Sequence, residues 1–136
     1  MRYFLAKTDP ETYSIDQLEK EKRTSWDGVN NPQAVRAIRE MQPGDKVFIY
    51  HSGGLSAVVG LAKVASEPKD DPKNPKSAVA DFEYLGRIDP PVTLAEIKQS
   101  KLFDDWALVR QGRLSTMAAP EKFVEWMRKK NPKAKI

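Results

Sequence analysis

Two consecutive β-forming stretches in the middle of the chain constrain its fold more than any other feature. Residues 46–52 are rich in β-branched and aromatic side chains, and residues 57–65 form a second apolar stretch. Gly53 and Gly54 lie between them, and paired glycines are typical of a tight hairpin turn because glycine adopts positive φ values at little cost. We therefore expect a β-hairpin at the centre of a sheet.

Further strands are expected on either side of this hairpin. Residues 2–6 and residues 78–85 alternate between apolar and polar positions in the manner of strands. Residues 67–77 contain three prolines and alternating charges, which predicts an exposed loop. Pro90 and Pro91 are expected to end the strand that begins at residue 78, because proline cannot donate to a β-ladder.

Two helix starts carry the capping-box pattern. Ser14 precedes Gln17 by three residues, and Thr93 precedes Glu96 by three residues. In each pair the hydroxyl can accept from a backbone amide while the longer side chain reaches back to the cap. The first pair predicts a helix over residues 15–21, and the second predicts a helix through residues 97 and 98.

Two other helices are predicted from proline and from apolar spacing. Asn31 suits an N-cap with Pro32 in the first helical position, and Pro120 suits the start of a last helix. A turn of helix is also expected around Phe103 and Trp106, before a polar segment over residues 110–117. The inward positions of the two longer helices are expected at Ala34, Ile38 and Met41, and at Phe123, Val124 and Met127.

The order of these elements indicates the fold class. The strands lie at separated positions and do not alternate regularly with helices, which favours a mixed α+β domain over a parallel doubly wound sheet. We expect a curved sheet or barrel decorated by short helices. The length of 136 residues predicts one domain over residues 1–136, with a solvated basic tail from about residue 129.

Composition excludes several classes of protein. The chain has no cysteine, which removes disulfides and thiolate metal sites, and fits a cytoplasmic protein. No apolar run approaches the roughly 20 residues that span a bilayer, so we expect no membrane partner. The start of the chain lacks the pattern of a secretion signal. The formal net charge of +4 favours a polyanionic partner only weakly.

Catalytic sites are addressed by elimination. His51 is the one histidine, so a histidine-containing metal site lacks a second imidazole or thiolate ligand. A serine nucleophile would need His51 as its base, and Ser52 is followed directly by a glycine turn and not by a nucleophile elbow. Phosphate-binding glycine motifs are absent. The sequence therefore predicts no enzyme, no metal and no cofactor.

Three segments place polar or aromatic residues where each has two interpretations. Trp26 either fills the core under a loop or borders a binding pocket. His51 and Ser52, at the end of an apolar strand, are either structural groups or ligand contacts. Arg110 and Arg113 flank Gly112 and form either a surface turn or the rim of a pocket, where a guanidinium could hold a phosphate or a base edge.

The same segments belong to a larger set of motifs. Six motifs follow one another along nearly the whole chain: 7–10 (KTDP), 26–29 (WDGV) with Asn31, 44–45 (GD), 50–52 (YHS), 91–94 (PVTL), and 110–115 (RQGRLS) with Met117. This is the order found in EVE domains, which the chain resembles. The resemblance implies a PUA-like fold, a β-barrel wrapped by short helices and related to YTH and ASCH domains. Asn30 departs from the family pattern, where an arginine is common.

The resemblance also implies a function and a site. EVE domains are similar to readers of modified bases such as 5-methylcytosine, so the expected partner is DNA or RNA that carries a modified base, bound by a monomer. The alternatives are an enzyme or sensor for a free modified nucleotide or small metabolite in the same pocket, and a protein-interaction module. The resemblance and the arginine loop predict a site built from Lys7, Trp26, Asn31, Tyr50, His51, Ser52, Arg110, Arg113, Leu114 and Ser115.

Overall fold

The predicted central hairpin is present in the computed structural model, which describes residues 1–136. Strand β3 (Lys46–His51) pairs with the antiparallel strand β4 (Ala57–Val64). Gly53 and Gly54 in the turn have φ values of 78° and 56°. Side chains disfavour such angles, so the two glycines allow the turn that joins the strands. The predicted hairpin is confirmed.

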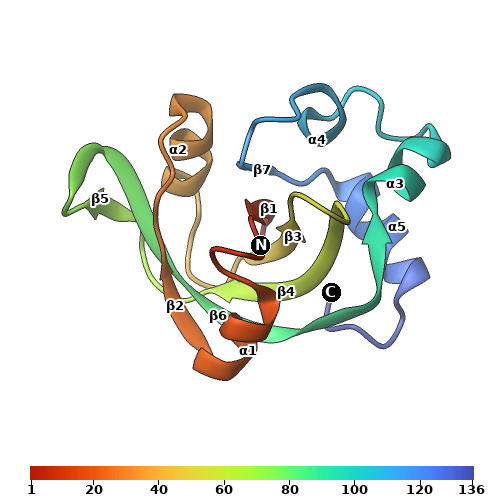
Figure 1. Ribbon diagram of the computed structural model, residues 1–136, viewed down its shortest axis with the longest axis horizontal. Helices are drawn as coiled ribbons and strands as arrows, with labels where there is room; N and C mark the ends of the chain where they lie inside the picture. Colours follow the sequence, from red (N-terminus) through yellow and green to blue (C-terminus); the bar gives the residue numbers. More distant parts are fainter.

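The sheet has seven strands and curls on itself without closing (Figure 1). β3 and β4 lie in its middle, and β3 also pairs in parallel with β1 (Tyr3–Thr8). The order is β2 (Arg23–Trp26), β6 (Asn74–Thr93), β4, β3, β1 and β7 (Thr116–Ala118), and the short β5 (Lys69–Asp71) pairs with β6. The α+β class and the curvature are confirmed. The end strands β2 and β7 do not pair, so the barrel remains open.

Five helices surround the sheet. α1 begins after Ser14 and α3 after Thr93, each with both hydrogen bonds of its capping box, and α2 begins after Asn31 with Pro32 in its first turn. Figure 1 shows α3 and α5 together at one end of the sheet, with β5 at the other end. No helix is long and apolar enough to cross a membrane. The bounds are α1 (Ile15–Glu21), α2 (Pro32–Arg39), α3 (Leu94–Ser100), α4 (Ala107–Arg110) and α5 (Glu121–Lys130).

The interior is apolar and continuous between the sheet and its helices. All six inward positions expected of the two longer helices are buried. Beside α5 the aromatic rings pack on one another, with ring centroids 4.5 Å apart for Trp106 and Phe123 and 5.3 Å apart for Phe103 and Phe123. We name these rings the core cluster. It consists of Phe48, Phe103, Trp106, Phe123 and Trp126.

The prediction of a loop over residues 67–77 is wrong. Lys69–Asp71 forms β5, and β6 begins at Asn74 and pairs back on it as a two-stranded ribbon. Residues 69–76 are exposed or half-buried, so this part of the ribbon shows charge and proline instead of apolar alternation. The two strands are therefore defined by their backbone pairing and cannot be identified from apolar alternation in the sequence.

Pro90 and Pro91 do not end β6, contrary to expectation. The strand continues to Thr93, and Val92 pairs with Val58 while Arg87 pairs with Gly60. The register shifts between these pairs and leaves the prolines without ladder partners. A proline is tolerated in such a place because its missing N–H has no partner to lose.

Three smaller differences concern short elements. No strand was expected at β2, and β7 begins at the end of the segment over residues 110–117, which was expected to be polar. The helical turn expected around Trp106 begins one residue later, as α4. β2 and β7 are edge strands of four and three residues, too short to show a periodicity of their own.

The lysines of the basic tail are exposed as expected, while the end of the chain is held against the protein. Lys46 Nζ donates to the carbonyl of Lys135 at 2.6 Å, and the side chains of Ala134 and Ile136 pack against the core. Arg128 donates to the hydroxyl of Tyr3 at 3.0 Å. The tail therefore folds back over the start of the chain.

Candidate nucleic-acid interface

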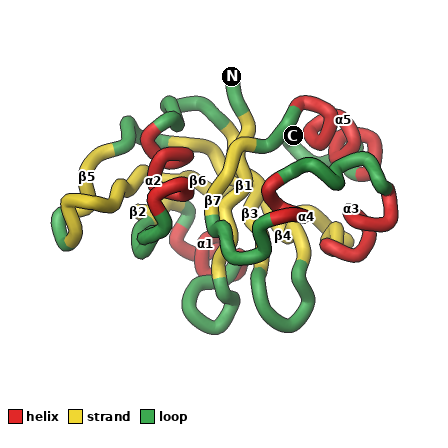
Figure 2. Tube along the Cα trace, turned by 90° about the horizontal axis from the view of Figure 1, so that it is seen from above, coloured by secondary structure: helices red, strands yellow, loops and turns green.

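The ends of β1 and β3 bring two of the predicted segments side by side. Because the strands are parallel, both end at the same edge of the sheet, where Lys7 pairs with Tyr50 and Thr8 with His51. Figure 2 shows the loops that follow these strands projecting from the same side of the molecule. The third segment joins them, since the Lys7 amide donates to the carbonyl of Ser115 at 2.7 Å.

A cavity of about 500 Å³ opens beside this junction. Three of the predicted site residues, Lys7, Trp26 and Ser115, line it. They come from the end of β1, the end of β2 and the segment before β7, so three distant parts of the sequence meet there. The remaining lining residues are Thr8, Asp9, Thr12, Tyr13, Thr24, Ser25, Asp27, Gly28 and Val29.

Trp26 is both a core residue and a wall of this cavity. Its side chain stacks on Phe82, with ring centroids 5.0 Å apart and planes 23° apart, and Tyr13 meets it edge-on at 6.0 Å. We name Tyr13, Trp26 and Phe82 the pocket cluster. The residue therefore fills the core and also borders a cavity, because one face of the indole is packed on Phe82.

The indole N–H of Trp26 has no hydrogen-bond partner within the protein. Trp106, which has nearly the same exposure, donates its N–H to the carbonyl of Ala118 at 2.9 Å. Every fully buried side-chain nitrogen or oxygen has a partner, so the Trp26 N–H must retain some exposure. A donor of this kind is available to a bound molecule.

Lys7 connects the cavity to the arginine loop. Its ammonium donates to the carbonyl of Gly112 at 3.0 Å and lies 5.5 Å from the centre of the Tyr50 ring. Partial burial lowers the pKa of Lys7 below its ordinary value. Tyr50 is buried beneath it, and burial raises the pKa of its phenol. Tyr50 thus supports Lys7 without lining the cavity.

His51 and Ser52 lie on the other side of the loop that follows β1. They line a second cavity of about 640 Å³, whose wall also includes Asp16 and Arg87. Asp9 borders both cavities. The imidazole Nε2 of His51 accepts a hydrogen bond from the backbone N–H of Ile15 at 3.0 Å. The structure therefore separates these two residues from the Trp26 cavity, although the sequence analysis grouped them with it.

Asn31 and Leu114 also lie outside this cavity. The Asn31 side chain accepts from the amides of Gln33 and Ala34 at 2.8 and 3.2 Å, so it serves as the cap of α2. Leu114 is buried and lines a smaller cavity beneath α2 and α4, while the next residue, Ser115, lines the Trp26 cavity. Neighbouring side chains of an extended segment point to opposite sides, which explains the difference.

The two arginines of the loop differ in their freedom. Arg110 donates to the carbonyl of Asp104 at 3.0 Å and to the carboxylate of Asp105 at 3.3 Å. Arg113 is exposed and forms no ion pair or side-chain hydrogen bond. Neither is among the residues that line the Trp26 cavity. Arg113 therefore keeps its full hydrogen-bonding capacity for a partner.

Sequence reasoning missed most of the polar lining. Asp27 is exposed and has no hydrogen-bond partner, and Thr24 belongs to the unpredicted strand β2. Tyr13 stands just before a predicted cap, and an aromatic residue in that place is a signal that could have been used. No group of three or more His, Cys, Asp or Glu side chains is arranged to hold a metal ion.

The chain is similar in sequence to curated proteins. Thymocyte nuclear protein 1 from Rattus norvegicus is 31% identical over 124 residues, which cover 71% of this chain and 55% of that protein. The Homo sapiens protein of the same name is 30% identical over the same shares. The chain spans about half the length of these curated relatives.

Solved structures agree in fold. A hypothetical protein from Leishmania major has a TM-score of 0.90 and 30% identity, covering 97% of this chain and 95% of its own. The human THYN1 protein in complex with 5-methylcytosine containing DNA has a TM-score of 0.87 and 23% identity, covering 98% and 99%. The sequence profile of the EVE domain matches residues 2–130. The PUA-like fold is thereby confirmed, and the chain belongs to the EVE domain family.

Proposed function

We propose that this protein binds a modified nucleobase, turned out of its nucleic-acid strand, in the Trp26 cavity. The observation that carries the proposal is a tryptophan that lines an open cavity and has an unpaired N–H. The human THYN1 protein, whose fold this chain shares, has been solved with 5-methylcytosine containing DNA. DNA is therefore the first strand to test, and RNA the second.

The size and walls of the cavity suit a single base. A volume of about 500 Å³ lies within the usual range for small-molecule sites, roughly 300 to 1,000 Å³. Stacking on an aromatic side chain contributes about 1–3 kcal/mol per base. Turning a base out of a duplex costs a few kcal/mol, so stacking alone would leave little net affinity. Polar contacts must supply the rest.

The polar lining favours a base whose edge carries both an amine, which donates hydrogen bonds, and a carbonyl and ring nitrogen, which accept them. Asp9 and Asp27 carry carboxylates, which accept hydrogen bonds, and the exocyclic amine of cytosine donates them. Lys7 and the Trp26 N–H are donors for the carbonyl and ring nitrogen of the same base. Val29 and the aromatic rings offer an apolar wall, where burial of a methyl group adds about 0.8 kcal/mol.

Affinity for the strand would come from the surface near the cavity. Arg113, in the loop that Lys7 holds, is exposed and forms no ion pair. Arg36, on α2, is also exposed and unpaired, and it lines the smaller cavity beneath α2 and α4. Contacts of such groups with phosphates release counterions and make binding sensitive to salt. With a net charge of only +4, this contribution is modest, so the modified base decides which strands are bound.

The proposal includes no chemical step. A general base must have a free lone pair within reach of the reacting group. His51 is the only histidine, and its Nε2 lone pair is occupied by the Ile15 N–H outside the Trp26 cavity. His51 is therefore not placed to act as a general base in this cavity, and the proposal assigns the carboxylates of Asp9 and Asp27 to hydrogen bonds with the base.

Binding of short oligonucleotides tests the proposal. Fluorescence anisotropy would compare DNA and RNA strands that contain 5-methylcytosine, cytosine or thymine at one position. We expect the native protein to prefer the modified strand. Asp27→Asn should weaken that binding by about ten- to a hundredfold, the effect of losing a hydrogen bond to a charged group worth about 1.5–3 kcal/mol. Asp104→Asn, an exposed carboxylate outside the cavity, should leave it unchanged.

Tryptophan variants separate binding from folding. Trp26→Ala should abolish selective binding, and Trp26→Phe should keep the stacking surface while losing the donor. Trp106→Phe is the matched control, because it removes an indole N–H that is bonded to Ala118 in the core. Equal selectivity in Trp26→Ala and the native protein would refute the proposal.

A further inference from the structure

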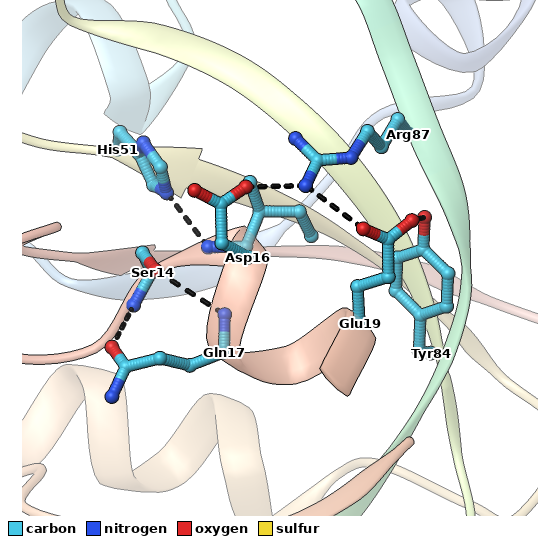
Figure 3. Close-up of polar contacts among 8 residues, drawn as sticks. Ser14, Asp16, Gln17, Glu19, His51, Tyr84 and Arg87 are labelled. Carbon is cyan, nitrogen blue, oxygen red and sulfur yellow. Dashed lines mark hydrogen bonds and ion pairs between the residues drawn. The ribbon is translucent and has the colours of Figure 1, made fainter. Parts of the chain in front are cut away.

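A second polar site adjoins the Trp26 cavity and joins β3 to the start of α1 (Figure 3). At its centre, His51 Nε2 accepts the backbone N–H of Ile15, the first residue of α1, at 3.0 Å. This amide is among the first of a helix, which have no partner inside the helix. His51 supplies that partner from a strand 36 positions further along the chain.

The bond requires an unprotonated Nε2. A neutral imidazole has one nitrogen with a free lone pair, whereas both nitrogens of an imidazolium are donors. A protonated His51 would therefore face the Ile15 N–H with a second donor. The contact cannot persist in that state, so the position of this amide depends on the charge of one side chain.

The segment held by His51 leads directly to the pocket cluster. Tyr13 lies two residues before Ile15 and meets the Trp26 ring edge-on at 6.0 Å. The Thr8 hydroxyl donates to the Tyr13 carbonyl at 2.7 Å, and Thr8 is the β-ladder partner of His51. The loop that lines both cavities is thus fixed at both ends by connected contacts among His51, Ile15, Tyr13 and Thr8.

The packing of the Ile15 side chain also fixes the start of α1. Its side chain is buried and packs over Gly60 of β4 so closely that Ile15 Cγ1 lies 2.8 Å from where a Cβ would stand. The start of α1 therefore sits in a fitted position between β3 and β4. A small displacement of the Ile15 backbone is passed on to Tyr13, because only Ser14 separates the two residues.

We propose that His51 is a positioning residue for the Trp26 cavity: as a neutral imidazole it holds Tyr13 against Trp26, and its protonation loosens this wall and weakens base binding. The inference rests on the proposed function and adds a regulation to it. His51 lies outside the base pocket and acts on it through its hydrogen bond to the backbone at the start of α1.

The burial of His51 and the charged groups around it determine its pKa. Burial lowers the pKa of His51 below its ordinary value of 6.5, Asp16 on α1 opposes this, and Arg87 on β6 adds to it. Asp9 and Glu11 border the same cavity from the loop before α1. Arg87 is itself paired with Asp16 and with Glu19, at 3.0 Å for Glu19 (Figure 3), so the charge of Asp16 is already engaged. His51 is therefore neutral at pH 7 and gains its proton in weak acid.

Binding measured against pH tests the inference. Affinity for a 5-methylcytosine strand should be constant above about pH 7 and fall about five- to tenfold in weak acid, below the ordinary pKa of histidine. In His51→Gln the amide oxygen can accept from Ile15 at any pH, so this variant should bind as tightly as the native protein near pH 7 and lose the acid-side decline. His51→Ala should bind about five- to tenfold more weakly near pH 7, without that decline.

A second measurement needs no nucleic acid. Amide hydrogen exchange at Ile15 and Tyr13, followed by NMR, should be faster in weak acid than the chemical rate predicts in the native protein, but not in His51→Gln. Superimposable pH profiles of the native protein and His51→Gln, in both measurements, would overturn the inference. Failure of the proposed function would look different, since the native protein would then show no preference for the modified strand at any pH.

Discussion

The pocket cluster and the core cluster are built from the same kinds of side chain, yet the cavities beside them differ. Trp26 borders a cavity of about 500 Å³ whose lining is mostly polar, whereas Trp106 borders one of about 270 Å³ whose lining is mostly hydrophobic. Trp26 and Trp106 are 7% and 9% exposed, so their burial is nearly equal. Around Trp106, other rings lie on several sides and the indole N–H is bonded to Ala118. Around Trp26, Phe82 covers one face, the N–H is unpaired, and polar side chains line the adjoining cavity.

This contrast shows that burial alone does not distinguish an aromatic residue that we propose to bind a base from one that only packs in the core. The useful differences are an unpaired donor and the polar character of the neighbours. Interior rings are packed to a density that leaves no room for a ligand. A ring at the border of a cavity keeps its apolar surface and adds directed hydrogen bonds, which give selectivity.

The largest expected effect would come from the core cluster. Phe123→Ala removes a fully buried ring that contacts Phe48, Phe103, Trp106 and Trp126, and should lower the free energy of unfolding by about 3–5 kcal/mol. Urea denaturation measures the loss. Selective binding should survive in the cold, where the variant remains folded. A variant that kept its stability and lost selective binding would break the distinction between the two clusters.

Effects of intermediate size are expected at the two capping boxes, whose hydroxyl groups can be removed by a matched pair of substitutions. Ser14→Ala and Thr93→Ala each remove an N-cap hydroxyl and should each cost about 1 kcal/mol of stability, measured by thermal unfolding. Only Ser14 adjoins Tyr13, so only Ser14→Ala should also weaken binding of the modified strand. Equal binding by the two variants would show that the start of α1 does not shape the cavity.

The smallest effect is expected at the arginine loop. Arg113→Ala should leave stability unchanged and should reduce the slope of log affinity against log salt by about 0.9, the value for one phosphate contact. Titrations at several salt concentrations measure this slope. Lys69→Ala, on β5 at the far end of the sheet (Figure 1), is the control and should keep the native slope. The preference for a modified base should remain in both variants, because Arg113 does not line the Trp26 cavity.

Much of the fold could be predicted from local signals. The hairpin around Gly53 and Gly54 and the caps at Ser14, Asn31 and Thr93 are present as expected. Each depends on residues within a few positions of one another, where the chain's own geometry determines the hydrogen bonds. The strands missed were β2, β5 and β7, which are short and lie at edges, so they show little apolar alternation.

The site was predicted less completely than the fold. The resemblance to EVE domains pointed to segments of which three residues, Lys7, Trp26 and Ser115, meet at one cavity. His51 and Ser52 were assigned to the same pocket and lie in the next one. A motif tells which segments come together, whereas the side of the backbone on which each side chain lies depends on strand register and on the path of the loop between β1 and α1.

The amino-acid sequence by itself determined the central hairpin, the capped helix starts and the inward faces of the two longer helices, because these follow from dihedral preferences and from periodic burial. Tertiary structure alone decided which tryptophan lies beside the polar cavity and which histidine atom meets a helix amide. Those contacts join residues far apart in sequence, such as Lys7 with Gly112 and Trp26 with Ala80. They form only when the whole sheet has curled, so no local pattern encodes them.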